Sequence, residues 1–125
     1  MTFTLFLAVA VGALVGAPSR FLLDRFISER IESDLPWGTF AINVSGSLLL
    51  GLLTGMTLAG HLHALPQALL GTGFCGAYTT FSTFTYESVQ LFEEGRIFEA
   101  LANAIVSLVV GLVGATAGVS LGLVL

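Results

Sequence analysis

The chain places an unusual set of residue types between residues 71 and 87, in the order GTGFCGAYTTFSTFTYE. Glycine costs about 1 kcal/mol relative to alanine inside a helix, and adjacent threonines lose rotamer freedom there. This stretch is therefore the weakest helical segment of the chain. An interruption here would free backbone carbonyl oxygens, which are good ligands for a small cation. The first chemistry that these residues suggest is cation binding by main-chain oxygens.

Two aromatic rings follow the glycines. Phe81 and Phe84 stand three residues apart and share one helix face, while Thr80, Thr83 and Glu87 form a neighbouring polar edge. Phenylalanines at this spacing more often pack in a core or face lipid. An aromatic ring has a positive edge, however, so two ring edges beside threonine hydroxyls can hold a small anion. Glu87 is either a member of this polar edge or a solvated residue near the helix end.

Polar residues also recur on two other segments. The pattern N-xxx-S-xxx-G begins at Asn43 and is repeated from Asn103. Small residues at a spacing of four let membrane helices approach closely, and polar ones hydrogen-bond between helices. For Asn43, pore lining and interhelical packing explain the pattern equally well. Arg20 ends an apolar run. An arginine in this place more often extends to the membrane interface and pairs with an acid such as Asp24 than attracts an anion.

The elements that must position these residues are membrane helices. Of the 125 residues, 55% are hydrophobic and 10% are charged, and the mean hydropathy is +0.96, which is too apolar for a soluble domain. Crossing the hydrocarbon takes roughly 20 helical residues. We predict an all-α membrane protein with a single domain, residues 1–125, and four spans at about 3–26, 37–60, 65–93 and 97–125.

Composition also limits the function. No nucleophile, base and orienting group converge in the sequence, so we do not expect an enzyme. The formal charge is −4, with no lysine, and we expect no nucleic-acid partner. Four short helices enclose too little room for a pathway lined on all sides, which favours a homodimer in the lipid bilayer.

Three motifs in this order resemble a known family of small four-span membrane proteins. They are GAPSR at 16–20, GTFAINVSGS at 38–47 and GAYTTFSTFTYE at 76–87. Together they are similar to the fluoride channels called CrcB or Fluc, and the resemblance covers essentially the whole chain. The third motif is highly specific.

The resemblance implies a fluoride-selective channel in the plasma or inner membrane that exports fluoride passively from the cytoplasm. It implies a dual-topology antiparallel dimer, in which the third helix is broken at mid-membrane. Carbonyls of Gly76 and Thr79 from each subunit would hold a sodium ion with a structural role. Because Arg25, Arg30 and Arg96 lie in loops on one side, pairing with an oppositely oriented homologue stays open.

The resemblance also assigns residues to the fluoride pore. They are the ring pair, an amide on the second helix, a vestibule arginine and a polar track: Phe81, Phe84, Asn43, Arg20, Ser82, Thr83, Asn103 and Ser107. The chain departs from the family pattern at Ala77, where many relatives have glycine, and at Asn103, where tyrosine or another hydroxyl residue is frequent.

Two other functions compete with this interpretation. A proton-coupled small multidrug exporter is also a four-helix antiparallel dimer, but it needs a titratable carboxylate in the membrane core, usually on the first helix. The first span has none, and Glu87 is the only candidate near the interior of a span. A structural membrane subunit without permeation of its own is the other possibility.

Overall fold

The computed structural model describes residues 2–33 and 35–125, and these residues form helices and connecting turns without a β-strand. The expected all-helical fold is confirmed. In chain order the helices are α1 (Phe3–Arg30), α2 (Trp37–Leu58), α3 (Ala64–Pro66), the π-helix η1 (Gln67–Cys75), α4 (Gly76–Tyr78), α5 (Ser82–Glu93) and α6 (Ile97–Val124).

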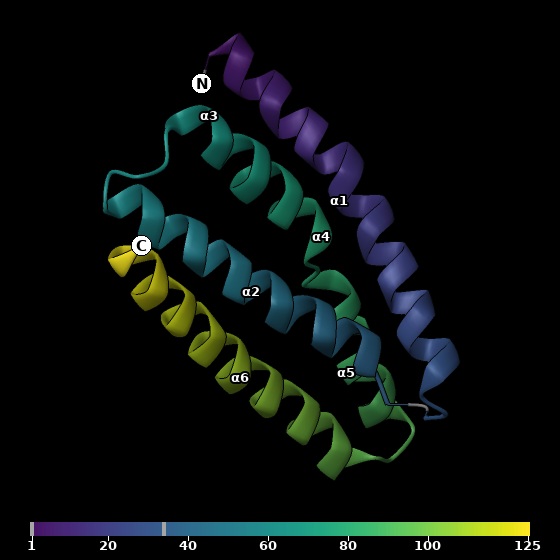
Figure 1. Ribbon diagram of the computed structural model, residues 1–125. Coiled ribbons are helices and arrows are strands. Elements are labelled where there is room, and N and C mark those ends of the chain that lie inside the picture. The colour runs from purple at the N-terminus through teal and green to yellow at the C-terminus, as the bar shows by residue number, and fades with distance from the viewer. Residues whose placement is uncertain (1, 34) are drawn as a thin grey trace.

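Three of these helices, α1, α2 and α6, are long and apolar enough to cross a membrane. Figure 1 shows them side by side, with the segment from α3 to α4 lying between α1 and α2, and with α6 on the other side of α2. Both chain termini lie at the end of the molecule opposite the α1–α2 connection. An even number of passes through the bundle accounts for this arrangement.

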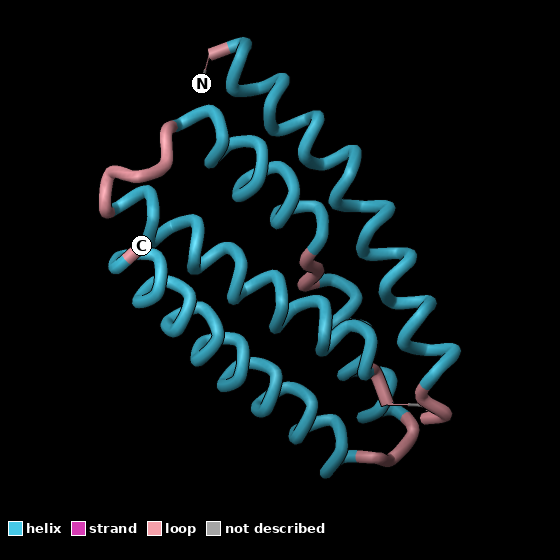
Figure 2. Tube along the Cα trace, in the orientation of Figure 1, coloured by secondary structure: helices cyan, strands magenta, loops and turns pink. Residues whose placement is uncertain are grey.

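The segment predicted as one span over residues 65–93 is divided into several pieces. Residues 64–78 are helical, but nine of them, Gln67–Cys75, form a π-helix. The chain then leaves the helix at Thr79, whose φ of −79° and ψ of 160° are extended, and it becomes helical again at Ser82. Figure 2 shows this short interruption between α4 and α5. It lies after the glycines rather than among them.

Glycines at the helix contacts explain how closely the helices approach. A Cβ on Gly51 of α2 would lie 2.3 Å from the carbonyl oxygen of Ala115 on α6, and a Cβ on Gly118 would lie 2.3 Å from that of Leu48. Real Cβ atoms do not tolerate such distances, so the two backbones are in direct contact. Small residues on α2 and α6 thus form a packing surface between the two helices.

Two glycines end helices by adopting a left-handed conformation. Gly60 follows α2 with φ of 80°, and Gly95 follows α5 with φ of 78°. After α5, the Arg96 N–H donates to the Leu91 carbonyl (2.9 Å) and the Gly95 N–H donates to the Phe92 carbonyl (3.1 Å). This pair of hydrogen bonds is the Schellman motif. It turns the chain directly from α5 into α6.

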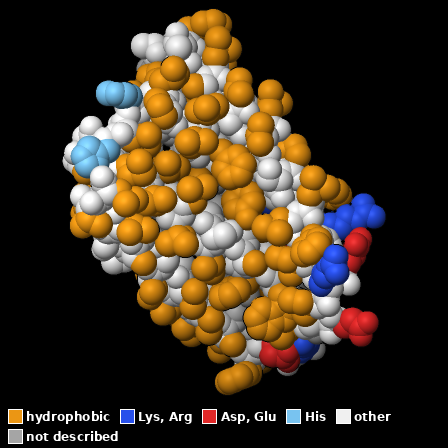
Figure 3. Space-filling view, in the orientation of Figure 1, with side chains coloured by type: hydrophobic (Ala, Val, Ile, Leu, Met, Phe, Trp, Pro, Cys, Tyr) orange, Lys and Arg blue, Asp and Glu red, His pale blue; other side chains and the backbone are white. Residues whose placement is uncertain are grey.

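The outer surface carries many large apolar side chains. Large side chains on the long helices are exposed, with Leu14 73% and Phe98 84% accessible. Figure 3 shows the hydrophobic side chains spread over the face in view, the arginines and acidic residues at one end and the histidines toward the other. A surface of this kind suits lipid, with charged side chains at an interface.

Candidate functional site

A groove of about 360 Å³ lies where α2 and α6 face the interruption after α4. Four of the residues predicted for a pore lie together in it: Asn43, Phe81, Phe84 and Ser107. Its other lining residues are mostly small or apolar: Gly46, Ser47, Leu50, Thr79, Thr80, Leu108, Gly111, Leu112 and Ala115. The groove therefore combines amide, hydroxyl and aromatic groups from three separate segments.

The Asn43 side chain binds the interrupted backbone at two points. Its Nδ2 donates to the Thr80 carbonyl at 2.8 Å, and its Oδ1 accepts the Thr80 N–H at 2.9 Å. Thr80 is buried, so both of its main-chain polar groups need partners. The amide of Asn43 supplies them, and it fixes residue 80 against α2. A second Nδ2 hydrogen remains for another acceptor.

The hydroxyl of Thr80 organises the first turn of α5. It accepts the Thr83 N–H at 3.2 Å and donates to the Thr83 hydroxyl at 3.2 Å, and it lies 3.4 Å from the Ser82 hydroxyl. Accepting an N–H three residues ahead is the function of a helix N-cap. Three hydroxyl groups are thus gathered at the start of α5. Ser82 and Thr83 are exposed and do not line the groove itself.

These contacts divert two main-chain donors. In a continuous helix, the Thr80 N–H would bond to the Gly76 carbonyl, and the Thr83 N–H would bond to the Thr79 carbonyl. Here the Thr80 N–H donates to Asn43, and the Thr83 N–H donates to the Thr80 hydroxyl. The carbonyls of Gly76 and Thr79 therefore do not receive the donors that a helix would give them.

The close approach of α2 to the interruption depends on Gly46. A Cβ at this position would lie 2.2 Å from Cγ2 of Thr79 and 3.3 Å from the Tyr78 ring. Beside it, the Ser45 hydroxyl lies 2.9 Å from the Tyr78 hydroxyl. The glycine makes the Asn43 contact possible, because any larger side chain would push the interruption away from α2.

The two phenylalanines predicted for the pore contact each other. The Phe81 and Phe84 ring centroids are 6.0 Å apart and the ring planes are inclined by 46°. Phe84 is half-buried, whereas Phe81 is 78% exposed. An exposed ring beside a polar groove presents its edge and face to whatever covers this side of the subunit.

A chain of polar contacts connects α5 with α6. Asn103 Nδ2 donates to the Ser88 hydroxyl at 2.8 Å, and that hydroxyl donates to the Phe84 carbonyl at 2.9 Å. The Ser107 hydroxyl donates to Asn103 Oδ1 at 3.5 Å. Asn103 does not line the groove but a second hollow of about 180 Å³, and Ser107 lines both. Ser107 is therefore part of the wall of both hollows.

Glu87 tethers two helices. The Thr39 hydroxyl donates to its Oε1 at 2.6 Å, which joins α2 to α5. Glu87 lines a small cavity of about 120 Å³ outside the groove, together with Gln90 and Glu94. Its carboxylate is thus engaged in a structural contact.

Arg20 is the predicted pore residue that lies apart from the others. It belongs to α1, which packs mainly on η1 and also on α4 and α2, and it lines none of the described hollows. Sequence reasoning missed Gly46, Ser88 and the anchoring function of Thr80. Gly46 lies within the motif at 38–47, and Thr80 lies within that at 76–87. Only Ser88 had no such signal.

Comparison with known proteins assigns the chain to one family. Residues 7–119 match the family model described as CrcB-like protein, Camphor Resistance (CrcB). A protein of Streptomyces avermitilis named fluoride-specific ion channel FluC 1 is 55% identical over 113 residues, which cover 90% of this chain and 91% of that protein.

Two further relatives carry similar names. The fluoride-specific ion channel FluC 1 of Nocardia farcinica is 46% identical over 90% of this chain and 77% of its own length. The fluoride-specific ion channel FluC 2 of Moorella thermoacetica is 46% identical over 90% of this chain and 91% of its own length. The match spans all the long helices and the interruption. This multi-pass membrane chain belongs to the CrcB family.

Proposed function

We propose that this protein is a fluoride-selective ion channel that exports fluoride passively from the cytoplasm across the cell membrane. The observation that carries the proposal is the near full-length similarity to proteins named as fluoride-specific channels. The groove supports it independently, because it brings Asn43, Phe81 and Phe84 together. A negative membrane potential drives an anion outward by about 2.3 kcal/mol per charge per 100 mV.

The groove has groups that suit a small, strongly hydrated anion. Fluoride must exchange its water for other donors. The free Nδ2 hydrogen of Asn43 can donate to it, and the Ser107 hydroxyl can do so when it turns away from Asn103 Oδ1, which lies 3.5 Å from it. The ring edges of Phe81 and Phe84 add positive partial charge without a formal charge that would trap the ion. Ser82 and Thr83 add hydroxyls beside Thr80 at the start of α5, and the Asn103 amide adds a polar group at the second hollow.

The interruption supports a cation site next to the anion path. We assign the interruption to the middle of the membrane and a structural sodium ion to the carbonyls of Gly76 and Thr79. Their helical donors are diverted, so these oxygens fit a hard cation. Apart from its chain neighbours and the backbone of its own helix, no described atom lies within 4 Å of the position that a Cβ on Gly76 would occupy, which leaves this backbone open to a second subunit. A nearby cation would lower the electrostatic cost of an anion in a low-dielectric interior.

The second subunit would be another copy of this chain, inserted antiparallel. Within one chain the groove is open on one side, and the Phe81 ring beside it is 78% exposed. A path across lipid needs protein on all sides, because water and ions are excluded from hydrocarbon. A partner covering this face closes the groove. Arg20, within the second half of α1, would then lie in the vestibule.

The exporter alternative has less support. Its proton-carrying carboxylate would have to be Glu87, which accepts a hydrogen bond from Thr39 and lies outside the groove. Proton-coupled export of cationic drugs that is lost in Glu87→Gln would favour it.

Efflux from liposomes tests the channel. Purified protein is reconstituted, and fluoride release is followed with a fluoride electrode while chloride release is measured in parallel. We expect rapid fluoride release and negligible chloride release. Equal rates for the two halides would contradict the proposal.

Replacing sodium with a larger organic cation tests the sodium site. We expect fluoride release to become slower, and unchanged release would contradict the sodium assignment alone.

A ring substitution tests the site within the same assay. Phe81→Ile removes the ring edge at the groove, and we expect fluoride release to fall at least about tenfold, equivalent to the loss of about 1.4 kcal/mol. Phe98→Ile is the matched control, because Phe98 is 84% exposed on α6 and does not line the groove. Equal rates in the two variants would remove Phe81 from the path.

A further inference from the structure

The interruption is attached to α2 on both of its sides. After it, the Asn43 amide binds the main chain of Thr80. Before it, Tyr78 is the last residue of α4, and its hydroxyl lies 2.9 Å from the hydroxyl of Ser45 on α2. Thr79 lies between these two attachments and carries one of the carbonyls that we assign to the sodium ion. The hydroxyl pair, Tyr78 and Ser45, is therefore adjacent to that site.

The Tyr78 hydroxyl is the donor within the pair. The Ser45 hydroxyl has a single proton, which it donates to the Ile42 carbonyl at 3.1 Å, and its oxygen can still accept. Tyr78 is 8% exposed, and its ring stacks on that of Phe74 with centroids 5.4 Å apart and planes inclined by 15°. A buried phenol needs a partner for its hydroxyl, and Ser45 supplies it.

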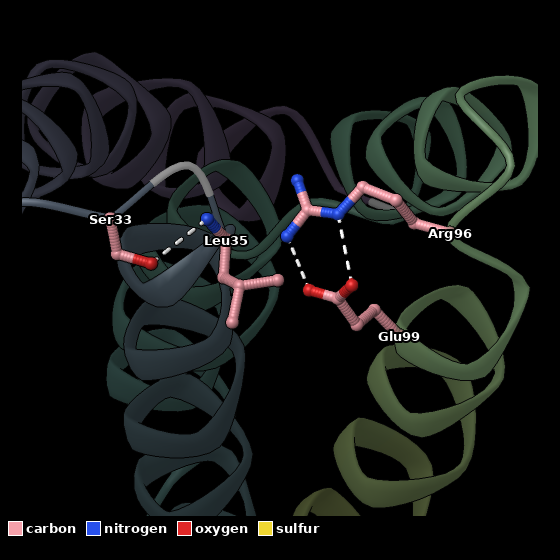
Figure 4. Close-up of polar contacts among 4 residues, drawn as sticks. All are labelled: Ser33, Leu35, Arg96 and Glu99. Carbon is pink, nitrogen blue, oxygen red and sulfur yellow. Dashed lines mark hydrogen bonds and ion pairs between the residues drawn. The ribbon is translucent and has the colours of Figure 1, made fainter.

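The hydroxyl pair connects two helices that are distant in the sequence. Its members are 33 residues apart. The contacts in Figure 4 instead join neighbours in the sequence: the Leu35 N–H donates to the Ser33 hydroxyl at 3.1 Å, and Arg96 Nε donates to Glu99 Oε1 at 3.0 Å. A contact between distant segments fixes how one helix lies against another, which a contact between neighbours does not.

The pair fixes where α4 lies along α2. The three residues of α4, Gly76–Tyr78, pack on α1, and the Tyr78 hydroxyl ties them to α2 as well. The N–H and the hydroxyl of Thr79 both donate to the Cys75 carbonyl, at 3.0 and 2.9 Å, so Thr79 moves with α4. The Gly76 carbonyl belongs to the same short helix. A shift of Tyr78 along α2 would therefore displace both carbonyls that we assign to the sodium ion.

Asn43 alone does not place both carbonyls. The peptide between Thr79 and Thr80 is planar and trans, so the Thr79 carbonyl points away from the Thr80 N–H, which Asn43 holds at 2.9 Å. This contact sets the direction of the Thr79 carbonyl. The Gly76 carbonyl lies on α4 and is not directed by it. The distance between the two oxygens thus depends on a second constraint, which the hydroxyl pair provides.

We propose that the hydrogen bond from Tyr78 to Ser45 positions the carbonyls of Gly76 and Thr79 for sodium, and thereby sets the sodium concentration that the channel needs. The proposal rests on the sodium site proposed above. Tyr78 does not line the groove, and it is a positioning residue that binds neither ion itself. The net contribution of one neutral hydrogen bond corresponds to about a two- to tenfold change in an equilibrium constant.

Sodium titration of the protein tests the proposal with two measurements. One is the denaturation midpoint in detergent while sodium replaces a larger organic cation at constant ionic strength, because a ligand of the folded protein raises the midpoint. The other is fluoride efflux from liposomes with the same sodium concentration on both sides. We expect Tyr78→Phe to need about two- to tenfold more sodium for the half-maximal effect in both measurements. At saturating sodium, its flux should equal that of the parent protein.

Variants of Ser45 test whether the two hydroxyls act through each other. Ser45→Ala leaves the buried Tyr78 hydroxyl without its acceptor, so its shift should be at least as large as that of Tyr78→Phe. The double variant should need no more sodium than Ser45→Ala alone, because both changes remove one contact. Ser45→Thr keeps the acceptor and is expected to behave like the parent.

Tyr86→Phe is the matched control. It removes the same hydroxyl from a residue of α5 that is 68% exposed and lines none of the described hollows. Its sodium dependence is expected to equal that of the parent.

The possible outcomes separate this proposal from the sodium site. A midpoint that Tyr78→Phe lowers equally at every sodium concentration would show that the hydroxyl supports only the fold, and would overturn the proposal. An unchanged sodium dependence, the same shift in Tyr86→Phe, or shifts that add in the double variant would overturn it as well, and the sodium site would stand. A parent whose midpoint and flux do not depend on sodium overturns both, and its selective conduction of fluoride would still support the channel.

Discussion

Asn43 and Thr80 show how one side chain can organise a break in a helix. A buried backbone without helical hydrogen bonds loses several kilocalories per mole unless other groups replace them. The amide of Asn43 has one donor and one acceptor in the right places, and both are used by Thr80. Its role in the site is therefore twofold: it holds the interruption, and it leaves a donor hydrogen toward the groove.

Asn43→Asp tests this pair of contacts. A carboxylate can still accept the Thr80 N–H, but it cannot donate to the Thr80 carbonyl, and it introduces a negative charge into the groove. We expect the unsatisfied carbonyl to lower the free energy of unfolding by about 1 to 3 kcal/mol. We also expect a strong reduction of fluoride efflux, measured with the fluoride electrode. Gln90→Glu makes the same chemical change at an exposed position on α5, outside the groove, and should conduct normally. Normal efflux in Asn43→Asp would exclude both roles.

At the scale of the helices, periodicity and composition predicted most of the fold. The predicted spans at 3–26, 37–60 and 97–125 correspond to α1, α2 and α6, because long apolar runs leave little choice of structure. The third span was harder to predict. Glycine and threonine propensities located a weak region, but the exact end of the helix at Tyr78 depends on contacts with Asn43 from another helix.

The sequence predicted the candidate site in part, as it did the fold. Residues on one helix face, such as Phe81 and Phe84, could be grouped by their spacing. That Asn43 and Ser107 join them in one groove follows from the α2–α6 packing, which spacing within a single helix does not reveal. The resemblance to a known family supplied that grouping. The π-helical form of Gln67–Cys75 had no signal in the sequence that we interpreted.

Packing between α2 and α6 gives a prediction about stability. Gly51→Ala would place a Cβ 2.3 Å from the Ala115 carbonyl oxygen and force the two helices apart. We expect the free energy of unfolding to fall by about 1 to 3 kcal/mol, which is measured as a lower denaturation midpoint in detergent. Gly114→Ala is the control, since its Cβ would meet its nearest atom at 3.6 Å, an ordinary contact. An unaltered midpoint in Gly51→Ala would show that the helices are not in backbone contact.

At the scale of the whole molecule, the dual orientation of the chain in the membrane is a prediction. Labelling of an introduced cysteine tests it. His61→Cys places a thiol in the exposed α2–α3 connection, whereas the native Cys75 is buried and should not react. With dual topology, a membrane-impermeant maleimide added to intact cells is expected to label about half of the protein. Labelling of all or none of the chains would indicate a single orientation, and the parent protein is the unlabelled control.

The uneven placement of charge has an electrical consequence. On the face that Figure 3 shows, the arginines and acidic side chains gather at one end of the subunit, so the two ends differ in electrostatic potential. In a parallel pair of subunits the two differences in potential would add, and the current would be larger in one direction than in the other. In an antiparallel pair, each face of the membrane would meet one charged end and one uncharged end, and the differences in potential would cancel. The current through such a pair would then be the same at opposite voltages, although each subunit alone is asymmetric.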